Sequence, residues 1–253
     1  MPEGDTNVQT IGVVGSGVLG TGIAELCAEA GYTVISVGPD RVPDLSAVAA
    51  ADIVIEALPS DEPSKAQALS EIGRHVGPDC LIATHSSSLS ITRLATNVPR
   101  PERFAGLHFF PPPKKLRVVE VVRPRLASDA TMEALRGLVE TLGSHPLMVR
   151  DQPGLLVDHL LFPYLNQAIA DYDDGLASAE DIQTAVQLGL GYPIGPLQLA
   201  DRIGLDVLLQ ATENVYAATR EQRFAPPPLL RELVDAGHLG NRTGAGLVVG
   251  TDR

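Results

Sequence analysis

Apolar residues in the first 150 positions fall into short runs, and polar segments with helical spacing separate them. The runs predict strands over residues 8–14, 32–37, 51–58, 80–85, 103–108, 116–122 and 145–149. Apolar residues at intervals of three and four predict helices over 19–30, 62–75 and 128–142, the last with Ser128 as its N-cap. Strands that alternate with helices predict an α/β fold with a parallel or mostly parallel sheet.

The pattern changes after "RDQPG" (150–154), and only helical spacing follows. Ser178 and Asp181 are spaced as a capping box, and Pro196 fits the first turn of a helix. The sequence therefore predicts an α/β domain over 1–150 and an all-helical domain over 151–253.

Composition narrows the class of protein. The 253 residues carry a formal net charge of −12, which argues against nucleic acid as a partner. Cys27 and Cys80 are the only cysteines, and both lie in apolar contexts, as the reduced thiols of cytoplasmic proteins do. The sequence shows no signal peptide, no apolar run that could span a bilayer and no metal-binding pattern. We therefore expect a cytoplasmic protein without a metal.

The segment "GSGVLG" joins the first predicted strand to the first predicted helix. It places Gly15, Gly17 and Gly20 in the order GxGxxG, with Val18 and Leu19 between the last two. The first glycine permits a tight turn, the second lets a pyrophosphate approach the backbone, and the third lets helix and strand pack closely. The amides at the helix start then face the phosphates. The segment therefore predicts a dinucleotide-binding site.

The choice of dinucleotide depends on the end of the second predicted strand, "VISVGPDR". An acidic side chain there would hold the ribose hydroxyls of NAD. Gly38 occupies that position, and Asp40 follows two residues later, within reach of the ribose. Gly38 with Arg41 would instead admit the additional phosphate of NADP. The segment favours NAD and leaves NADP open.

Two ionisable residues interrupt apolar runs: His108 in "GLHFF" and Glu120 in "VVEVV". A buried carboxylate without a partner is costly, so such a group normally has a partner or a shifted pKa. The turn "PPPKK" between the two predicted strands would bring the two residues together. They are then either an acid–base pair or a satisfied core histidine beside an edge-strand carboxylate.

Several longer segments show a family pattern. They are, in chain order, "IGVVGSGVLGTGIA", "ADIVIEALP", "THSSSLSIT", "RPERFAGLHFFPP", "VVEVV", "DQPGLLVDHLLFPYLNQA", "LGLGYPIGPLQLADRIGLD" and "GNRTGAGL". Through them the chain resembles the L-3-hydroxyacyl-CoA dehydrogenase family. The resemblance implies a Rossmann-type domain, a helical C-terminal domain and a homodimer formed through those helices. It also implies reversible oxidation of an L-3-hydroxyacyl thioester to a 3-ketoacyl thioester.

The resemblance implies roles for individual residues. His108 matches the family's catalytic histidine, and Glu120 matches its acidic partner. Ser87 matches a serine that hydrogen-bonds the substrate oxygen, and Lys65 matches a lysine near the cofactor. The imidazole would take the hydroxyl proton as hydride leaves C3, while Glu120 orients the ring and stabilises the imidazolium.

The sequence departs from the family at several positions. Asp158 replaces a substrate-orienting asparagine, and His159 replaces the arginine beside it. A carboxylate cannot donate a hydrogen bond unless it is protonated. Asp158 is therefore expected to be protonated, paired with His159 or His85, or directed at a different substrate group. Pro111 and His85 each replace an asparagine, and Ser60 replaces a glutamate that contacts the cofactor.

The connection between the second and third predicted strands is short. In the family a long helical hairpin follows this strand and contacts the CoA end of the substrate, whereas "GPDRVPDLSAVAA" is too short for a helical pair. The deletion favours substrate delivery on an acyl carrier protein, in a biosynthetic pathway, or a small hydroxy acid. The basic segments "KKLR" (114–117) and "RPR" (123–125) are either solvated turns or a docking site for an acidic carrier.

Three functions therefore compete. The first is a nicotinamide-dependent 3-hydroxyacyl thioester dehydrogenase, and the second is a dehydrogenase of a small hydroxy acid. The third is a non-catalytic homologue that binds a dinucleotide without turnover. The joint presence of His108, Glu120 and Ser87 argues against the third.

Overall fold

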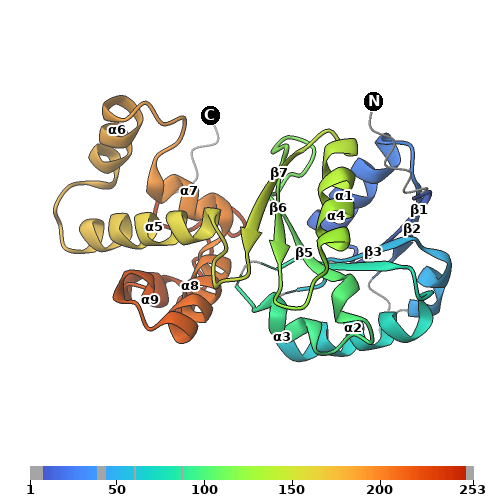
Figure 1. Ribbon diagram of the computed structural model, residues 1–253. Coiled ribbons are helices and arrows are strands. Elements are labelled where there is room, and N and C mark those ends of the chain that lie inside the picture. Colours follow the sequence, from blue (N-terminus) through green and yellow to red (C-terminus); the bar gives the residue numbers. More distant parts are fainter. Residues whose placement is uncertain (1–7, 39–43, 60, 87, 249–253) are drawn as a thin grey trace. The chain divides into compact units, whose positions relative to one another are not determined.

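The computed structural model describes residues 8–38, 44–59, 61–86 and 88–248. The chain divides into two compact units, one ending at Leu155 and one beginning at Leu156. The first contains the sheet and its covering helices, and the regular elements of the second, in its described residues, are all helices (Figure 1). The predicted fold class, an α/β domain followed by a helical domain, is confirmed.

The sheet of the first unit has, in its described residues, seven strands in the order β2-β1-β3-β4-β5-β6-β7. Neighbouring strands run parallel except β5 and β6, which are antiparallel. The bounds are β1 Thr10–Val14, β2 Thr33–Val37, β3 Ile53–Glu56, β4 Leu81–Thr84, β5 Phe104–Phe109, β6 Val118–Arg123 and β7 His145–Arg150. Strands β3, β4 and β5 are buried along their whole length, because helices cover both faces of the sheet.

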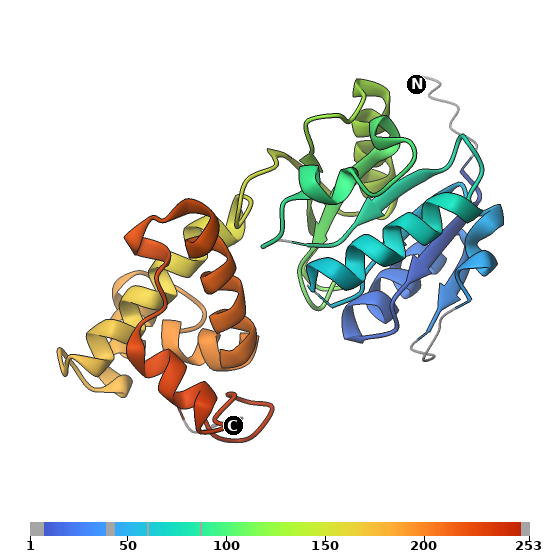
Figure 2. The same cartoon turned by 90° about the horizontal axis from the view of Figure 1, so that it is seen from below.

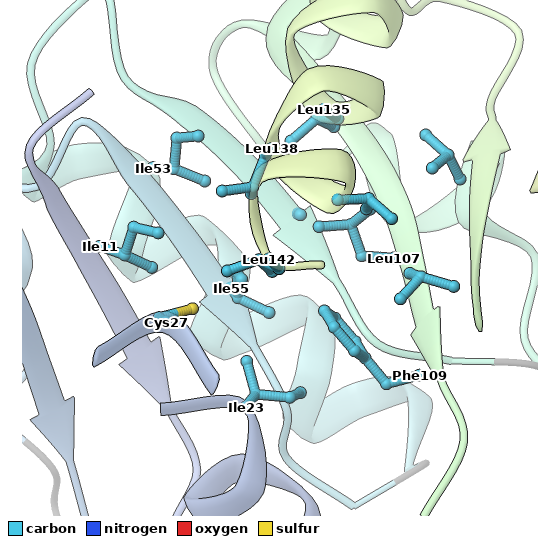
Figure 3. Packing of buried hydrophobic residues seen from close by; sticks show 14 of the residues in the cluster. Ile11, Ile23, Cys27, Ile53, Ile55, Leu107, Phe109, Leu135, Leu138 and Leu142 are labelled. Carbon is cyan, nitrogen blue, oxygen red and sulfur yellow. The ribbon is translucent and has the colours of Figure 1, made fainter. Parts of the chain in front are cut away.

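Two hydrophobic clusters fix the helices to opposite faces of this sheet. On one face, a single buried cluster contains Ile23 of α1 (Val18–Glu29), Leu135 of α4 (Asp129–Thr141) and Leu107 of β5 (Figure 3). On the other face, the cluster includes residues of α2 (Glu62–His75) and α3 (Ile91–Ala95). This two-sided covering is the reason that the central strands consist almost wholly of apolar residues.

Local sequence signals set the helix ends. Ser128 caps α4 by accepting a hydrogen bond from the Thr131 amide at 3.1 Å, as predicted. Asp61 caps α2 in the same way through the Ser64 amide at 3.0 Å. The described part of the connection from β2 to β3 contains one 3₁₀ helix, Leu45–Ala50. The described residues of this connection hold no helical hairpin, as the sequence predicted.

The second unit has, among its described residues, five α-helices, and their buried side chains form a hydrophobic core of their own. The backbone of these helices can be followed in Figure 2. They are α5 Val157–Asp173, α6 Ala179–Gly189, α7 Pro196–Ile203, α8 Leu205–Thr219 and α9 Pro228–Asp235. Ser178 caps α6 and Pro196 begins α7, as predicted. The buried Asp201 carboxylate accepts hydrogen bonds from the amides of Leu247 (2.9 Å) and Val248 (2.7 Å), and so ties the end of the described chain to α7. None of the described helices combines the length and the apolar character needed to cross a bilayer.

Candidate active site

The glycine turn lies at the carboxyl end of β1 and begins α1. Gly15 has a φ of +128°, and a Cβ there would come within 2.5 Å of the Ala57 carbonyl oxygen. A Cβ on Gly20 would lie 2.0 Å from the Gly15 carbonyl oxygen, so only glycine permits this contact between helix and turn. A Cβ on Gly17 would have no heavy atom within 4 Å, so the backbone is open to a ligand there.

The start of α1 suits the pyrophosphate of a dinucleotide. No side chain caps the helix at Gly17, and its first turn carries no acidic residue. Its free amides and the positive end of its dipole are therefore available to an anion. Val18, at the first helical position, is 82% exposed. Asp40, predicted to hold the ribose, lies outside the described residues, as do Arg41 and Ser60.

A buried ion pair lies at the carboxyl ends of β3 and β4. The Lys65 ammonium contacts both carboxylate oxygens of Glu56, at 2.8 and 3.0 Å, and both side chains are fully buried. The Glu56 carboxylate also accepts hydrogen bonds from the Thr84 hydroxyl at 2.5 Å and the Leu58 amide at 2.6 Å. Burial lowers the pKa of Lys65, and the Glu56 charge opposes that shift.

The pair gives Lys65 a partner that the sequence interpretation missed. Lys65 was assigned to the cofactor by resemblance, whereas its ammonium here also donates to the His85 carbonyl at 2.8 Å. Glu56 was not predicted as a site residue. It nevertheless interrupts the apolar run "ADIVIEAL" as Glu120 interrupts "VVEVV", so the same signal would have found it.

The antiparallel pairing of β5 and β6 brings His108 and Glu120 together. The two residues are direct partners in the strand register. His108 Nδ1 lies 2.6 Å from a carboxylate oxygen of Glu120; the Glu120 side chain is fully buried and His108 is 6% exposed. The predicted strand–turn–strand arrangement is thus confirmed. The edge-strand alternative for Glu120 is wrong, because β6 lies between β5 and β7.

A second histidine stacks on the first. The ring of His85 lies directly after β4, with its centroid 5.0 Å from that of His108 and an interplanar angle of 28°. Phe110 contacts the His108 ring edge-on, at 4.6 Å between centroids. Burial lowers the pKa of His85 well below 6.5, and repulsion from Lys65 and from a protonated His108 lowers it further. A backbone hydrogen bond at Leu107 raises it by a smaller amount.

The remaining predicted site residues are placed as follows. Ser87 lies outside the described residues. Asp158 stands in the first turn of α5, in the second unit. His159 Nε2 accepts a hydrogen bond from the Arg223 guanidinium at 2.8 Å, and its ring tilts against Phe224 at 4.9 Å. The guanidinium of Arg223 thus lies beside the position where the resembled family has its own arginine.

A cavity of about 510 Å³ opens at the other end of the strands, away from the glycine turn. It is lined by residues at the amino ends of β3 and β4, among them Asp52, Cys80 and Leu81, and by Arg103 just before β5. Ligands of such sheets bind outside the carboxyl ends of the strands, where the glycine turn, Glu56 and His85 lie. The cavity is therefore separate from the candidate active site.

The glycine turn and the strand order of the sheet define a dinucleotide-binding protein of Rossmann type. The profile described as "3-hydroxyacyl-CoA dehydrogenase, NAD binding domain" matches residues 10–42 and 40–152. The profile described as "3-hydroxyacyl-CoA dehydrogenase, C-terminal domain" matches residues 154–249. The chain belongs to the 3-hydroxyacyl-CoA dehydrogenase family. It is thereby an oxidoreductase of CH–OH groups with NAD as its cofactor.

Individual relatives match over almost the whole chain. A probable 3-hydroxybutyryl-CoA dehydrogenase of Deinococcus radiodurans is 34% identical over 271 residues, covering 93% of this chain and 98% of that protein. Among solved structures, FadB2 of M. tuberculosis has a TM-score of 0.94 at 32% identity, covering 96% of this chain and 99% of that one. An (S)-3-hydroxybutyryl-CoA dehydrogenase from Ralstonia eutropha has a TM-score of 0.91 at 35% identity, covering 97% and 100%.

The comparisons also locate the deletion. The N-terminal profile matches in two pieces that meet at residues 40–42, in the short connection after β2. The alignment to the Deinococcus protein extends over 271 positions, more than the 253 residues of this chain, so the relative carries residues that this chain lacks. The break in the profile match agrees with the loss of a segment between β2 and β3, whereas the alignment length shows that residues are missing without giving their position.

Proposed function

We propose that the protein interconverts a 3-hydroxyacyl thioester and a 3-ketoacyl thioester, with His108 as the acid–base group. The observation that carries the proposal is the buried contact of 2.6 Å between His108 Nδ1 and Glu120. Because Nδ1 faces the carboxylate, a neutral ring has its proton on Nδ1 and its lone pair on Nε2. His108 Nε2 is then the nitrogen that exchanges a proton with the substrate.

The His108 ring alternates between a neutral and a protonated state during the reaction. In the oxidation direction His108 takes the proton of the C3 hydroxyl, and the fully buried Glu120 stabilises the imidazolium that forms. NAD, when bound at the glycine turn, supplies the acceptor for the hydride. In the reduction direction His108 returns the proton to the C3 oxygen. A histidine suits both directions because its ordinary pKa lies near neutral pH.

Three further residues complete this proposal, two beside the substrate and one beside the cofactor. Ser87 donates a hydrogen bond to the C3 oxygen. Asp158, as a carboxylate, accepts a hydrogen bond rather than donating one, so it suits a substrate group that carries its own hydrogen. Asp40 holds the ribose of NAD. These three roles rest on the sequence, and the turnover of Ser87→Ala and Asp158→Asn variants would test the first two.

The relatives named 3-hydroxybutyryl-CoA dehydrogenase favour a short acyl-CoA substrate. The shortened connection after β2 favours a second candidate, the same acyl group on a carrier protein. The proposed basic docking site is weaker than the sequence suggested, because Lys114 contacts Glu29 at 2.5 Å and Glu25 at 3.3 Å. These two glutamates of α1 raise the pKa of Lys114 and neutralise its charge.

A spectrophotometric assay tests the function and the carrier together. The absorbance of NADH would be followed with acetoacetyl-CoA and with acetoacetyl carrier protein, and the assays repeated with NADPH. Turnover with the CoA thioester would show that the missing segment is dispensable. Turnover with the carrier alone would place the enzyme in carrier-bound biosynthesis. Binding of NADH without turnover of either thioester would contradict the proposal.

The docking hypothesis predicts a selective effect of Lys115, the exposed lysine beside the paired Lys114. Lys115→Glu should raise KM for the carrier-bound substrate by roughly threefold to tenfold, because it removes one attraction and adds one repulsion. KM for acetoacetyl-CoA should stay within about twofold, since no acidic carrier takes part. Equal KM values for the carrier-bound substrate in the variant and the native enzyme would remove the hypothesis.

We further propose that the second unit forms a homodimer. Helix α6 has no buried residue, and the leucines near its two ends are exposed to solvent, Leu176 to 73% and Leu188 to 82%. Leu190 and Tyr192 are also exposed, so apolar side chains gather in one stretch of the described chain. A second copy would cover this surface. The two free, buried cysteines agree with a cytoplasmic location.

Replacement of Leu188 by aspartate should shift the dimer to a monomer. A charge in an apolar interface costs several kcal/mol unless it is paired, which is enough to dissociate a micromolar dimer. Light scattering during size-exclusion chromatography would measure the mass, with Leu126→Asp, an exposed leucine of the first unit, as the matched control. A Leu188→Asp protein with the native mass would show that α6 is not the interface.

A further inference from the structure

His85 is held in place through both its backbone and its ring. Its amide donates to the Glu56 carbonyl at 2.7 Å, and its carbonyl accepts from the Lys65 ammonium at 2.8 Å. Its ring nitrogen Nδ1 accepts a hydrogen bond from the Phe109 amide at 3.3 Å. His85 is therefore fixed by hydrogen bonds to three different elements, β3, β5 and α2.

This anchored ring is the surface on which His108 lies. The two rings stack with centroids 5.0 Å apart and planes 28° apart, while Phe110 meets His108 at an angle of 67°. The hydrogen bond to Glu120 fixes one edge of the His108 ring but leaves rotation about that contact open. The stack with His85 restricts this rotation, and so fixes the direction of the opposite nitrogen, Nε2.

The neutral state of the His85 ring also favours its stacking on His108. Burial, with repulsion from Lys65 and from a protonated His108, lowers the pKa of His85 well below its usual range and so favours the neutral ring. A neutral aromatic ring attracts the imidazolium that His108 becomes during oxidation, whereas a second imidazolium would repel it. The geometry therefore holds in both charge states of His108.

We propose that His85 is a positioning residue for His108: its ring, anchored by Glu56, Lys65 and Phe109, holds the His108 imidazole in the plane that aims Nε2 at the substrate. The inference rests on the proposed function, in which His108 exchanges a proton with the C3 oxygen. It assigns to His85 no contact with the substrate, only the orientation of the group that makes one.

Two substitutions separate the stack from the hydrogen bond. His85→Asn removes the ring but keeps an oxygen that can accept from the Phe109 amide, whereas His85→Phe keeps an aromatic ring and removes the acceptor. We expect His85→Asn to lower kcat by roughly tenfold to a hundredfold, the size of effect that a misdirected reacting group produces, with KM within about threefold. His85→Phe should restore kcat to within about threefold of the native enzyme.

Controls separate this inference from the proposed function. His75→Asn changes an exposed histidine of the same unit and should leave both constants unchanged. If the native enzyme turns over and His108→Ala does not, the function stands and the His85 variants test the inference alone. Native kcat in His85→Asn, or equal losses in the asparagine and phenylalanine variants, would overturn the positioning role.

A measurement without substrate covers variants that turn over too slowly to assay. The ¹⁵N and ¹H resonances of the His108 ring report its tautomer and its motion. We expect one sharp set in the native protein and in His85→Phe, and a broadened set in His85→Asn. An unchanged His108 spectrum in His85→Asn, with native circular dichroism, would overturn the inference.

Discussion

Alanine in place of His108 is expected to lower kcat for acetoacetyl thioester reduction by about a hundredfold to ten-thousandfold, the usual contribution of a general acid–base group. The affinity for NADH should stay within about twofold, because the glycine turn and α1 lie outside the strand that carries His108. Initial rates at saturating substrate would measure the first quantity, and fluorescence titration with NADH the second.

A matched pair of variants separates the two members of the dyad. Glu120→Gln keeps the size of the side chain and removes its charge, so the imidazolium loses its stabilising partner. Its loss of kcat should be smaller than that of His108→Ala, because Nε2 is still present. A His108→Ala enzyme with more than about a tenth of native kcat would contradict the acid–base role.

Methionine in place of Lys65 is expected to lower the free energy of unfolding by about 3 to 5 kcal/mol, the cost of leaving one member of a buried pair uncompensated. The Glu56 carboxylate would then be buried with only the Thr84 hydroxyl and the Leu58 amide as donors in the described part of the chain. Urea unfolding followed by circular dichroism would measure the loss.

A double variant tests the cause of that loss. Glu56→Gln combined with Lys65→Met removes both charges, so it should recover part of the stability that Lys65→Met alone loses. The same proteins report on the cofactor. A Lys65→Met protein of native stability that binds NADH weakly would show that the lysine serves the dinucleotide rather than the Glu56 pair.

Local patterns in the sequence determined much of this protein. The apolar runs predicted the strands and the helical spacing predicted α2 over the residues it occupies. The cap Ser128 and the first-turn proline Pro196 act on residues within three or four positions of themselves. Their effect can therefore be predicted from the sequence without knowledge of the fold. The glycine turn is equally local, because it consists of one strand end, one turn and one helix start.

The pairing of His108 with Glu120 was also predictable, and for a related reason. The two residues are twelve positions apart, on strands joined by a short turn. Antiparallel neighbours of this kind place residues equidistant from the turn opposite each other. A polar residue in each of two such apolar runs therefore predicts a contact before the rest of the sheet is known.

Only the tertiary structure decided which groups surround that pair. Glu56, Thr84 and Gly106 lie side by side because β3, β4 and β5 are parallel neighbours. Parallel strands are joined by long crossover connections, and the length of such a connection does not determine which residues pair. The Lys65 ammonium and the stacked ring of His85 follow from that register. Lys114 likewise forms ion pairs with two glutamates of α1, 85 and 89 positions away. Its charge is therefore paired within the chain, whereas the sequence suggested an unpaired charge at the surface. The sequence determines which chemical groups are present, but the packing of distant segments determines their partners and therefore their charge.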